Sequence, residues 1–173
     1  MQDRPFVQIA YFVEDIHAAA AWWSQERGAG PFLFLENIPL ENSRYRGAPG
    51  ELDHSSAYGQ LGDLMVELIQ QNNNGPSAFR EMYSAGEYGL HHMAQFSDDL
   101  EAELARYREQ GFETAFQASA GDLAFAFVDT TEKLGHMIEL YQDGDAIRGF
   151  YAAISAAQHD DTVLAELQKA MGG

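Results

Sequence analysis

The chain has 173 residues, 46% of them hydrophobic, which is enough to bury the core of one globular domain. Ten Lys and Arg stand against 27 Asp and Glu, and the formal net charge of −17 argues against nucleic acids and anionic membrane surfaces as partners. The chain lacks cysteine, an apolar signal segment at its start and any apolar run of the roughly 20 residues that a membrane helix needs, so we expect a cytoplasmic protein without disulfides.

The first half of the chain begins with a strand and a helix. Alternating hydrophobicity predicts a strand over residues 6–13, and Asp15 follows as a helix cap. Apolar residues then recur at helical spacing over 16–23. The stretch 36–52 carries Pro, Gly and Arg and is predicted to be a loop. Further strands are predicted over residues 32–35, 54–61 and 64–70.

The second half repeats this order of signals. A turn at 72–76 and a short helix over 77–83 lead into it. A strand over 92–96 is followed by Asp98 and Asp99 as candidate caps of the next helix. Strands are predicted over 113–117, 123–129 and 136–141, and helices over 146–157 and 162–171. The two last helices are expected to pack on the outside of the molecule or at a subunit interface.

An internal repeat relates the two halves. Gln8-Ile-Ala-Tyr-Phe-Val-Glu-Asp-Ile16 aligns with His92-Met-Ala-Gln-Phe-Ser-Asp-Asp-Leu100, and Leu64-Met-Val-Glu-Leu-Ile-Gln70 aligns with His136-Met-Ile-Glu-Leu-Tyr-Gln142. The sequence therefore predicts an α+β fold of two βαβββ modules. We expect one domain over 1–145, with module one at 5–72, a linker at 73–88, module two at 89–142, and a C-terminal helical extension at 146–173.

Two carboxylates lie at equivalent positions inside apolar strands, Glu67 in the first module and Glu139 in the second. A buried carboxylate is costly unless it is paired, and most of the eight arginines fall in predicted loops and helices. A metal ion is the other way to compensate both. Gln8 and His92 also occupy matching positions, so we predict an N/O site of Gln8, Glu67, His92 and Glu139 that suits Zn²⁺, Mn²⁺, Co²⁺ or Ni²⁺.

Other residues are secondary candidates. His91 neighbours His92, and because strand side chains alternate between faces, only His92 is expected to face the site. His54 is a candidate auxiliary base, and we expect it to line a substrate cavity together with Tyr11 and Phe125; the alternative for the aromatic residues is the core. The chain has no nucleophile elbow, phosphate loop, dinucleotide glycine fingerprint or His-Glu-x-x-His motif.

The doubled βαβββ pattern resembles the vicinal oxygen chelate superfamily over about residues 5–142, through Gly89-Leu-His-His-Met-Ala94, Asp98-Asp-Leu100 and Ile138-Glu-Leu140. This superfamily includes glyoxalase (lactoylglutathione lyase), methylmalonyl-CoA epimerase, extradiol dioxygenases and drug-resistance proteins. The resemblance implies two half-barrels of a curved mixed sheet around a divalent metal. It places the four metal contacts on Gln8, Glu67, His92 and Glu139, and Gln8 in place of a His disfavours dioxygenase chemistry.

The resemblance implies an isomerase, epimerase or lyase that enolises a carbonyl-containing small molecule, with Glu139 as the base and Glu67 as the second acid/base. The chain has two lysines, Lys133 and Lys169, and both lie outside the expected cleft, where a glutathione or coenzyme A ester would need cations. The net charge of −17 also repels an anionic thioester, so we expect an apolar or aromatic carbonyl compound as substrate. The alternatives are a protein that sequesters a ligand without turnover and, less favoured, a metal-dependent dioxygenase. Members of the superfamily are often dimers, and the C-terminal helices are candidates for such an interface.

Overall fold

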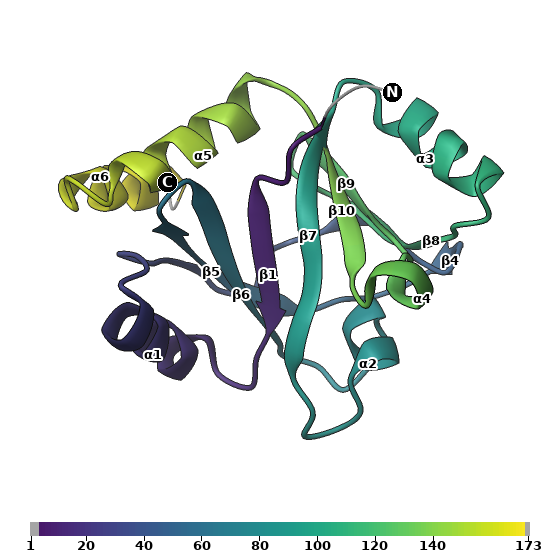
Figure 1. The fold of residues 1–173 in the computed structure, drawn as a ribbon, viewed down its shortest axis with the longest axis horizontal. Helices are drawn as coiled ribbons and strands as arrows, with labels where there is room; N and C mark the ends of the chain where they lie inside the picture. Colours follow the sequence, from purple (N-terminus) through teal and green to yellow (C-terminus); the bar gives the residue numbers. More distant parts are fainter. Residues whose placement is uncertain (1–3, 172–173) are drawn as a thin grey trace.

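The computed structural model describes residues 4–171, which fold into one ten-stranded sheet with six helices around it (Figure 1). The strands are β1 (Gln8–Phe12), β2 (Leu33–Leu35), β3 (Glu41–Tyr45), β4 (Ala48–Pro49), β5 (His54–Leu61), β6 (Leu64–Gln71), β7 (Gly89–Ser97), β8 (Thr114–Ala120), β9 (Leu123–Val128) and β10 (Met137–Gln142). The helices are α1 (Ile16–Arg27), α2 (Ala78–Met82), α3 (Leu100–Glu109), α4 (Thr131–Leu134), α5 (Asp145–Ala156) and α6 (Thr162–Met171). The predicted limits 1–145 and 146–173 include residues 1–3 and 172–173, which lie outside this description.

The sheet has the order β2-β5-β6-β1-β7-β10-β9-β8-β3-β4 and is curled into a half-barrel. The first strands of the two modules, β1 and β7, pair antiparallel at its centre, and each also pairs in parallel with the last strand of its own module, β6 or β10. The strand order β2-β5-β6-β1 is therefore mirrored by β8-β9-β10-β7. The structure confirms the predicted α+β fold of two related modules.

Helices α1 and α3 cover equivalent parts of the outer face of the sheet. The side chain of Asp15 accepts hydrogen bonds from backbone N–H groups of the first turn of α1, and Asp99 accepts one from Ala102 N in α3. Ile16 and Ala20 pack against β5 and β6, as apolar residues of α3 pack against β9 and β10. Because these contacts use one face of the last strands, Glu67 and Glu139 point to the other face.

The prediction that residues 36–52 form a loop is wrong, because they contain the β3–β4 hairpin. Arg46 and Gly47 make its two-residue turn with φ values of 49° and 80°, and two positive φ angles are the signature of a type I′ hairpin turn. The strand sequence Glu-Asn-Ser-Arg-Tyr shows no hydrophobic alternation. Pairing with the edge of β8 holds it instead, as in the pair Tyr45–Phe116, so that an insertion of module one extends the sheet of module two.

The C-terminal extension is not confined to the outside of the molecule, contrary to the sequence expectation. Helix α5 packs on the inner side of β5 and β6, where Ile154 belongs to a buried cluster with Tyr58 and Met65. In Figure 1 α5 and α6 lie next to β5 at one end of the molecule. Within residues 4–171 no helix has the length and apolar character that crossing a membrane requires.

Candidate functional site

Four side chains that the repeat aligns meet on the inner face of the sheet. Glu67 lies in the middle of β6, and Glu139 lies in β10 on the opposite side of the central β1–β7 pair. Gln8 and His92, near the starts of the repeated segments, supply the remaining two side chains. Gln8 and His92 are fully buried, and Glu67 and Glu139 are only 4% and 3% exposed. The parallel pairing of each first strand with its last strand produces this approach.

The polar atoms of this cluster lie at coordination spacing. His92 Nε2 is 2.9 Å from Glu139 Oε2 and 3.6 Å from Glu67 Oε2, and one ligand atom from each of these three residues lies within 4.8 Å of the others. Gln8 Nε2 donates a hydrogen bond to Glu67 Oε2. Although His92 Nε2 and Glu139 Oε2 are 2.9 Å apart, they are not aligned as a hydrogen bond, and within the described chain neither buried atom has another hydrogen-bond partner. Two orphaned atoms that face one another are a strong argument for a shared cation.

His91 orients His92. The two Nδ1 atoms are 2.9 Å apart, and His91 Nε2 is 3.1 Å from the carbonyl oxygen of Ala78. Burial lowers the pKa of His91 well below its ordinary value, so His91 is neutral and carries one ring proton. With that proton on Nε2, directed at Ala78, His91 Nδ1 accepts from His92 Nδ1. The lone pair of His92 Nε2 is then left to face the carboxylates, the arrangement usual for a metal-ligating histidine.

The electrostatics of the cluster call for an additional positive charge. Burial lowers the pKa of His92, but Glu139 and Glu67 outweigh it and raise the pKa to about 9, so a proton occupies Nε2 whenever no metal ion is bound there. Burial raises the pKa of Glu139 above its ordinary value, whereas contacts with His92 and Ser56 outweigh burial at Glu67 and lower its pKa. One imidazolium compensates only one of two buried carboxylates. Imidazole and carboxylate donors are those that Zn²⁺, Mn²⁺, Co²⁺ and Ni²⁺ accept, so the residues fit a divalent ion.

A cavity of about 250 Å³ opens over the cluster, and Glu67, His92 and Glu139 are among its lining residues. Most of its wall is apolar and aromatic. The other lining residues are Leu35, Ile38, Leu40, Leu52, His54, Tyr58, Ile69, Phe79, Ala120, Leu123, Phe125, Phe127, Tyr141, Ala146, Ile147, Phe150, Tyr151 and Met171. No Lys or Arg occurs among these described residues, so the cavity offers no cation to an anionic ligand.

The structure places two of the three predicted lining residues at the cavity. His54 and Phe125 line it, and His54 Nδ1 is buried without a hydrogen-bond partner in the described chain. Burial lowers the pKa of His54, which keeps it neutral at pH 7. Tyr11 is a correction: it lies on the outer face of β1, where its ring packs 5.3 Å from that of Trp23 in α1. Side chains alternate between the two faces of β1. Gln8 and Ala10 point to the inner face, so Tyr11 points to the outer face.

Three tyrosines of the cavity wall were missed by the sequence prediction. Tyr58 lies opposite Glu67 in the β5–β6 pair, and Tyr141 lies two residues after Glu139 on the same face of β10. Tyr151 comes from α5, and its hydroxyl donates a hydrogen bond to Gln8 Oε1. Strand alternation could have predicted that Tyr141 shares the face of Glu139, because the two residues are two positions apart. Nothing in the sequence indicates that α5 reaches Gln8.

Comparison with known proteins bears on this fold. The family model described as Glyoxalase/Bleomycin resistance protein/Dioxygenase superfamily matches residues 7–127, a segment that includes Gln8, Glu67 and His92 and ends before Glu139. No curated protein sequence matches the chain.

Three solved structures illustrate the similarity. A hypothetical protein from Bacillus halodurans C-125 matches with a TM-score of 0.59 and 16% identity, covering 83% of this chain and 97% of its own. Methylmalonyl-CoA epimerase from Mycobacterium tuberculosis matches with a TM-score of 0.56 and 16% identity, covering 83% and 91%. A selenomethionine structure of methylmalonyl-CoA epimerase matches with a TM-score of 0.53 and 19% identity, covering 84% and 100%. At these identities the similarity shows the fold.

The family model spans more than half of the chain, and the doubled βαβββ architecture agrees with it. The chain belongs to the Glyoxalase/Bleomycin resistance protein/Dioxygenase superfamily, known also as the vicinal oxygen chelate superfamily.

Proposed function

We propose that this chain is a divalent-metal-dependent isomerase, epimerase or lyase that acts by enolisation of a carbonyl-containing small molecule. The observation that carries the proposal is the buried Glu67–His92–Glu139 cluster at the wall of an apolar cavity. Its two carboxylates stand on either side of His92, and His92 Nε2 and Glu139 Oε2 have no hydrogen-bond partner among the described residues.

The residues of the cluster have different roles in this proposal. Glu67, His92 and Glu139, with Gln8 as the fourth residue, would hold a Zn²⁺, Ni²⁺, Co²⁺ or Mn²⁺ ion, which supplies Lewis-acid chemistry that makes a C–H beside a carbonyl more acidic. Glu139 takes the proton from that carbon, and Glu67, across the centre, serves as the second acid/base. Return of the proton to a neighbouring carbon is isomerisation, and return to the opposite face of the same carbon is epimerisation.

The cavity favours an uncharged apolar or aromatic carbonyl compound as substrate. Its described wall carries aromatic and aliphatic side chains and no Lys or Arg. The formal net charge of −17 also repels an anionic thioester at long range. The fold is shared with methylmalonyl-CoA epimerases, but the cavity lacks the cations that a coenzyme A ester would be expected to meet.

Metal content is the first test. The purified protein, dialysed without chelator, is analysed for Zn, Ni, Co, Mn and Fe, and we expect close to one equivalent of a non-iron metal per chain. His92→Ala should lose it, whereas His17→Ala, a change at an exposed histidine, should retain it. Stoichiometric iron would favour an oxygenase instead, and a protein that neither contains nor takes up metal would contradict the proposal.

Proton transfer is tested separately. A panel of uncharged aryl ketones with an acidic α-C–H is incubated with metal-loaded protein in D₂O, and exchange of that hydrogen is followed by proton NMR. We expect exchange with the wild-type protein and none with Glu139→Gln, which keeps the shape of the side chain but removes the base. Undiminished exchange by Glu139→Gln would contradict the role of Glu139.

The apolar cavity also favours a second candidate function, sequestration of a small molecule without turnover. Isothermal titration calorimetry measures such binding directly, because Trp22 and Trp23 belong to α1, on the outer face of the sheet, and do not line the cavity. Tight binding that needs no metal and leaves the ligand unchanged would support this candidate against the enzyme.

Cellular location and assembly are part of the proposal. The lack of cysteine fits a cytoplasmic protein. We propose a homodimer, which sedimentation velocity would show as twice the 19.2 kDa chain mass.

A further inference from the structure

Helix α5 brings a tyrosine of the C-terminal extension to the candidate metal centre. The Tyr151 hydroxyl donates a hydrogen bond to Gln8 Oε1, and Gln8 Nε2 donates one to Glu67 Oε2. Glu67 Oε2 is the same atom that lies 3.6 Å from His92 Nε2. An uninterrupted chain of polar contacts therefore links the extension to the centre.

The position of Tyr151 is fixed by the packing of α5. Its ring makes an edge contact with Phe96 of β7 at a centroid distance of 4.9 Å. The neighbouring Phe150 makes an edge contact with Tyr58 of β5 at 5.0 Å. Ile147 and Ile154, one turn before and one turn after this pair, are buried. Aromatic and aliphatic contacts on two strands thus hold α5 against the inner face of the sheet.

The hydroxyl of Tyr151 is suited to fix an amide. A tyrosine hydroxyl has an ordinary pKa of about 10, so it is protonated at neutral pH. A tyrosine hydroxyl donates and accepts, and rotation of the Gln8 amide by 180° exchanges its oxygen and nitrogen. When the Gln8 amide turns so that Oε1 faces the ion, Tyr151 accepts from Gln8 Nε2 instead of donating to Oε1, so its hydroxyl fixes the plane of the amide in either orientation.

We propose that Tyr151 is a positioning residue of the metal centre that acts through Gln8, which makes the C-terminal extension part of the site. The inference rests on the proposed metal-dependent function. It adds to it a residue that lies beyond the segment 7–127 matched by the family model. In this role Tyr151 binds Gln8 and affects the ion through Gln8.

The experiment measures the affinity of the full-length apoprotein for Co²⁺ and Zn²⁺, by Co²⁺ absorption and by competition with a chromogenic chelator. We expect Tyr151→Phe, which removes only the hydroxyl, to weaken metal binding about 10- to 100-fold, as is typical when a hydrogen-bond partner of a metal ligand is lost. Tyr151→p-aminophenylalanine restores at the same ring position a polar group that donates and, more weakly, accepts, and it should recover part of the lost affinity.

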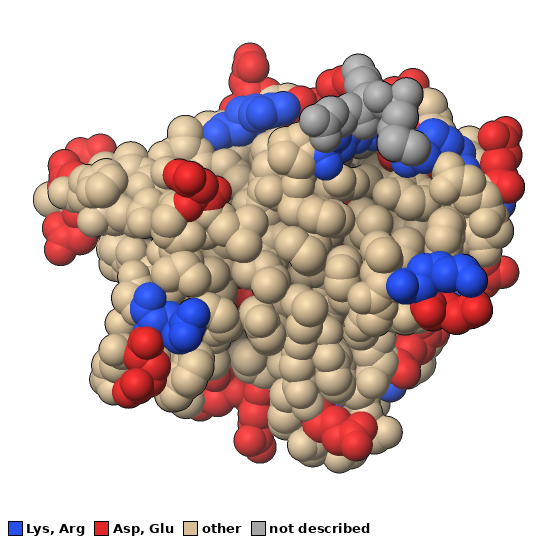
Figure 2. Space-filling model, viewed as in Figure 1, with Lys and Arg blue, Asp and Glu red and all other residues tan. Residues whose placement is uncertain are grey.

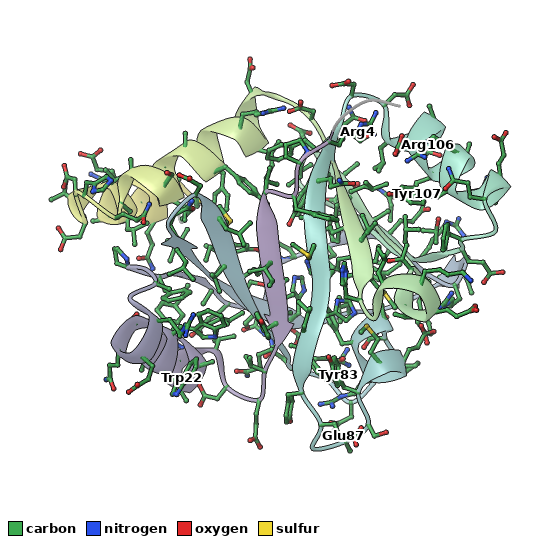
Figure 3. The ribbon with its side chains drawn as sticks, in the orientation of Figure 1. Arg4, Trp22, Tyr83, Glu87, Arg106 and Tyr107 are labelled. Atoms are coloured by element: carbon green, nitrogen blue, oxygen red, sulfur yellow. The ribbon has the colours of Figure 1, made fainter. Side chains whose placement is uncertain are left out.

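A double-mutant cycle separates positioning from a general structural effect. If Tyr151 acts through Gln8, Tyr151→Phe should change metal affinity little in a Gln8→Ala background. The matched control is Tyr83→Phe, because the Tyr83 hydroxyl also donates a hydrogen bond, at 2.6 Å to Leu90 O, but lies beside α2 away from α5 (Figure 3). We expect this control to bind metal as tightly as the wild type.

The outcomes distinguish this inference from the proposed function. If the wild type binds metal and Tyr151→Phe binds it with the same affinity, the role of Tyr151 alone is overturned. The same holds if Tyr151→Phe loses as much metal affinity in the Gln8→Ala background as in the wild-type background. Absence of metal binding by the wild type would overturn the proposed function and this inference together. Should Tyr151→Phe fail to fold, Tyr151→p-aminophenylalanine decides: an affinity close to that of the wild type supports the role, and a loss of about 10- to 100-fold despite the retained polar group contradicts it.

Discussion

At the scale of single residues, burial of like charges is the central physical problem of this protein. Glu67 and Glu139 are almost completely buried on the inner face of one sheet, and the described residues bring no Arg or Lys to them. His92 lies between them, and His91 and Gln8 fix the groups around the centre through hydrogen bonds. Such an arrangement is costly for a stable core and useful for binding a cation, because every donor is already oriented.

His54 provides a prediction at this scale. Its Nδ1 is buried at the cavity without a hydrogen-bond partner in the described chain, so the polar imidazole contributes little to the free energy of unfolding. We expect His54→Leu to leave the free energy of unfolding within about 0.5 kcal/mol of the wild type or to raise it, because replacing an unsatisfied polar group by an apolar one removes a desolvation cost. Equilibrium urea unfolding measures this.

The same variant separates His54 from the metal centre. Co²⁺ affinity should be unchanged in His54→Leu and lost in His92→Leu, because only His92 belongs to the cluster of ligand atoms. A loss of Co²⁺ binding in His54→Leu would show that His54 participates in the centre.

At the scale of elements, the first helix of each module, α1 or α3, begins with an aspartate whose side chain caps its N-terminus. In α3 the side chain of Asp99 accepts a hydrogen bond from Ala102 N, whereas Asp98 offers its backbone oxygen to Gln142 Nε2. The two adjacent aspartates therefore have different roles, although the sequence left both as candidate caps.

Helix capping by Asp99 is testable with its neighbour as the control. Asp99→Ala should lower the free energy of unfolding by about 1 kcal/mol, because the N–H of Ala102 loses its acceptor. Asp98→Ala should stay within about 0.5 kcal/mol of the wild type, because its side chain makes no capping bond. Urea unfolding of both variants checks this, and equal losses would contradict the assignment.

The β3–β4 hairpin is tied to the rest of the molecule by one arginine. Arg46 in its turn lies 2.6 Å from carboxylate oxygens of both Glu81 in the linker helix and Asp129 after β9. Tyr45 also donates to Glu81 at 2.6 Å. One guanidinium thus joins the insertion of module one, the linker and module two.

Removal of this arginine should destabilise the fold. Arg46→Met is expected to lower the free energy of unfolding by about 1–2 kcal/mol, because the charge-assisted hydrogen bonds to Glu81 and Asp129 and a longer one to Glu113 are lost, and partial exposure limits the effect. Arg44→Met is the matched control, since the side chain of the exposed Arg44 donates a hydrogen bond to the carbonyl of Gly47 and to no other residue in 4–171, and it should change stability by no more than about 0.5 kcal/mol.

The effect of Arg46 should depend on pH with a defined sign. Burial raises the pKa of Glu81 and of Asp129, but hydrogen bonds from Arg46 and from Tyr45 or Thr131 outweigh it and hold both below their ordinary values of 4.5 and 3.8. A depressed carboxyl pKa stabilises the folded state above the ordinary pKa and ceases to do so as pH falls through the folded value. The stability difference between wild type and Arg46→Met should therefore be largest at pH 7 and shrink below about pH 4.5. A difference that grows on acidification would contradict this account.

At the scale of the whole molecule, charge is unevenly placed on a strongly acidic chain. In the view of Figure 2 acidic and basic side chains lie mainly around the outline, and few charged atoms are visible in the middle of this face. With 27 acidic and ten basic residues, most carboxylates cannot be paired, so repulsion among them opposes the compact state at neutral pH.

This repulsion predicts stabilisation by salt. Raising the ionic strength from about 0.01 M to about 0.15 M shortens the Debye length from about 30 Å to about 8 Å. We therefore expect the Tm at pH 7 to rise with NaCl, measured by differential scanning calorimetry. The same salt increment should have little effect near the isoelectric point of 4.4, and a Tm that falls with salt at pH 7 would show that specific ion pairs outweigh the net repulsion.

The sequence by itself determined the repeated module and the approach of its carboxylates. Period-two alternation is a local signal, and the alignment of the segments that begin at Gln8 and His92 reveals two copies of one unit. Pairing of their first strands, β1 and β7, brings Glu67 and Glu139 to one centre. The Asp15 cap was predicted for the same reason, since capping depends on residues close in the chain, whereas the predicted strand over 92–96 was too short, because β7 spans Gly89–Ser97.

Only the tertiary structure decided the features that depend on distant partners. The β3–β4 hairpin has no hydrophobic alternation and forms because the edge of β8 offers hydrogen bonds to it. Tyr11 was assigned to the wrong face of its strand, and Tyr151 reaches Gln8 only because α5 packs across β5 and β6. Hydrophobic burial drives such packing, but it is non-directional, so the pattern of one helix does not specify which surface it will cover.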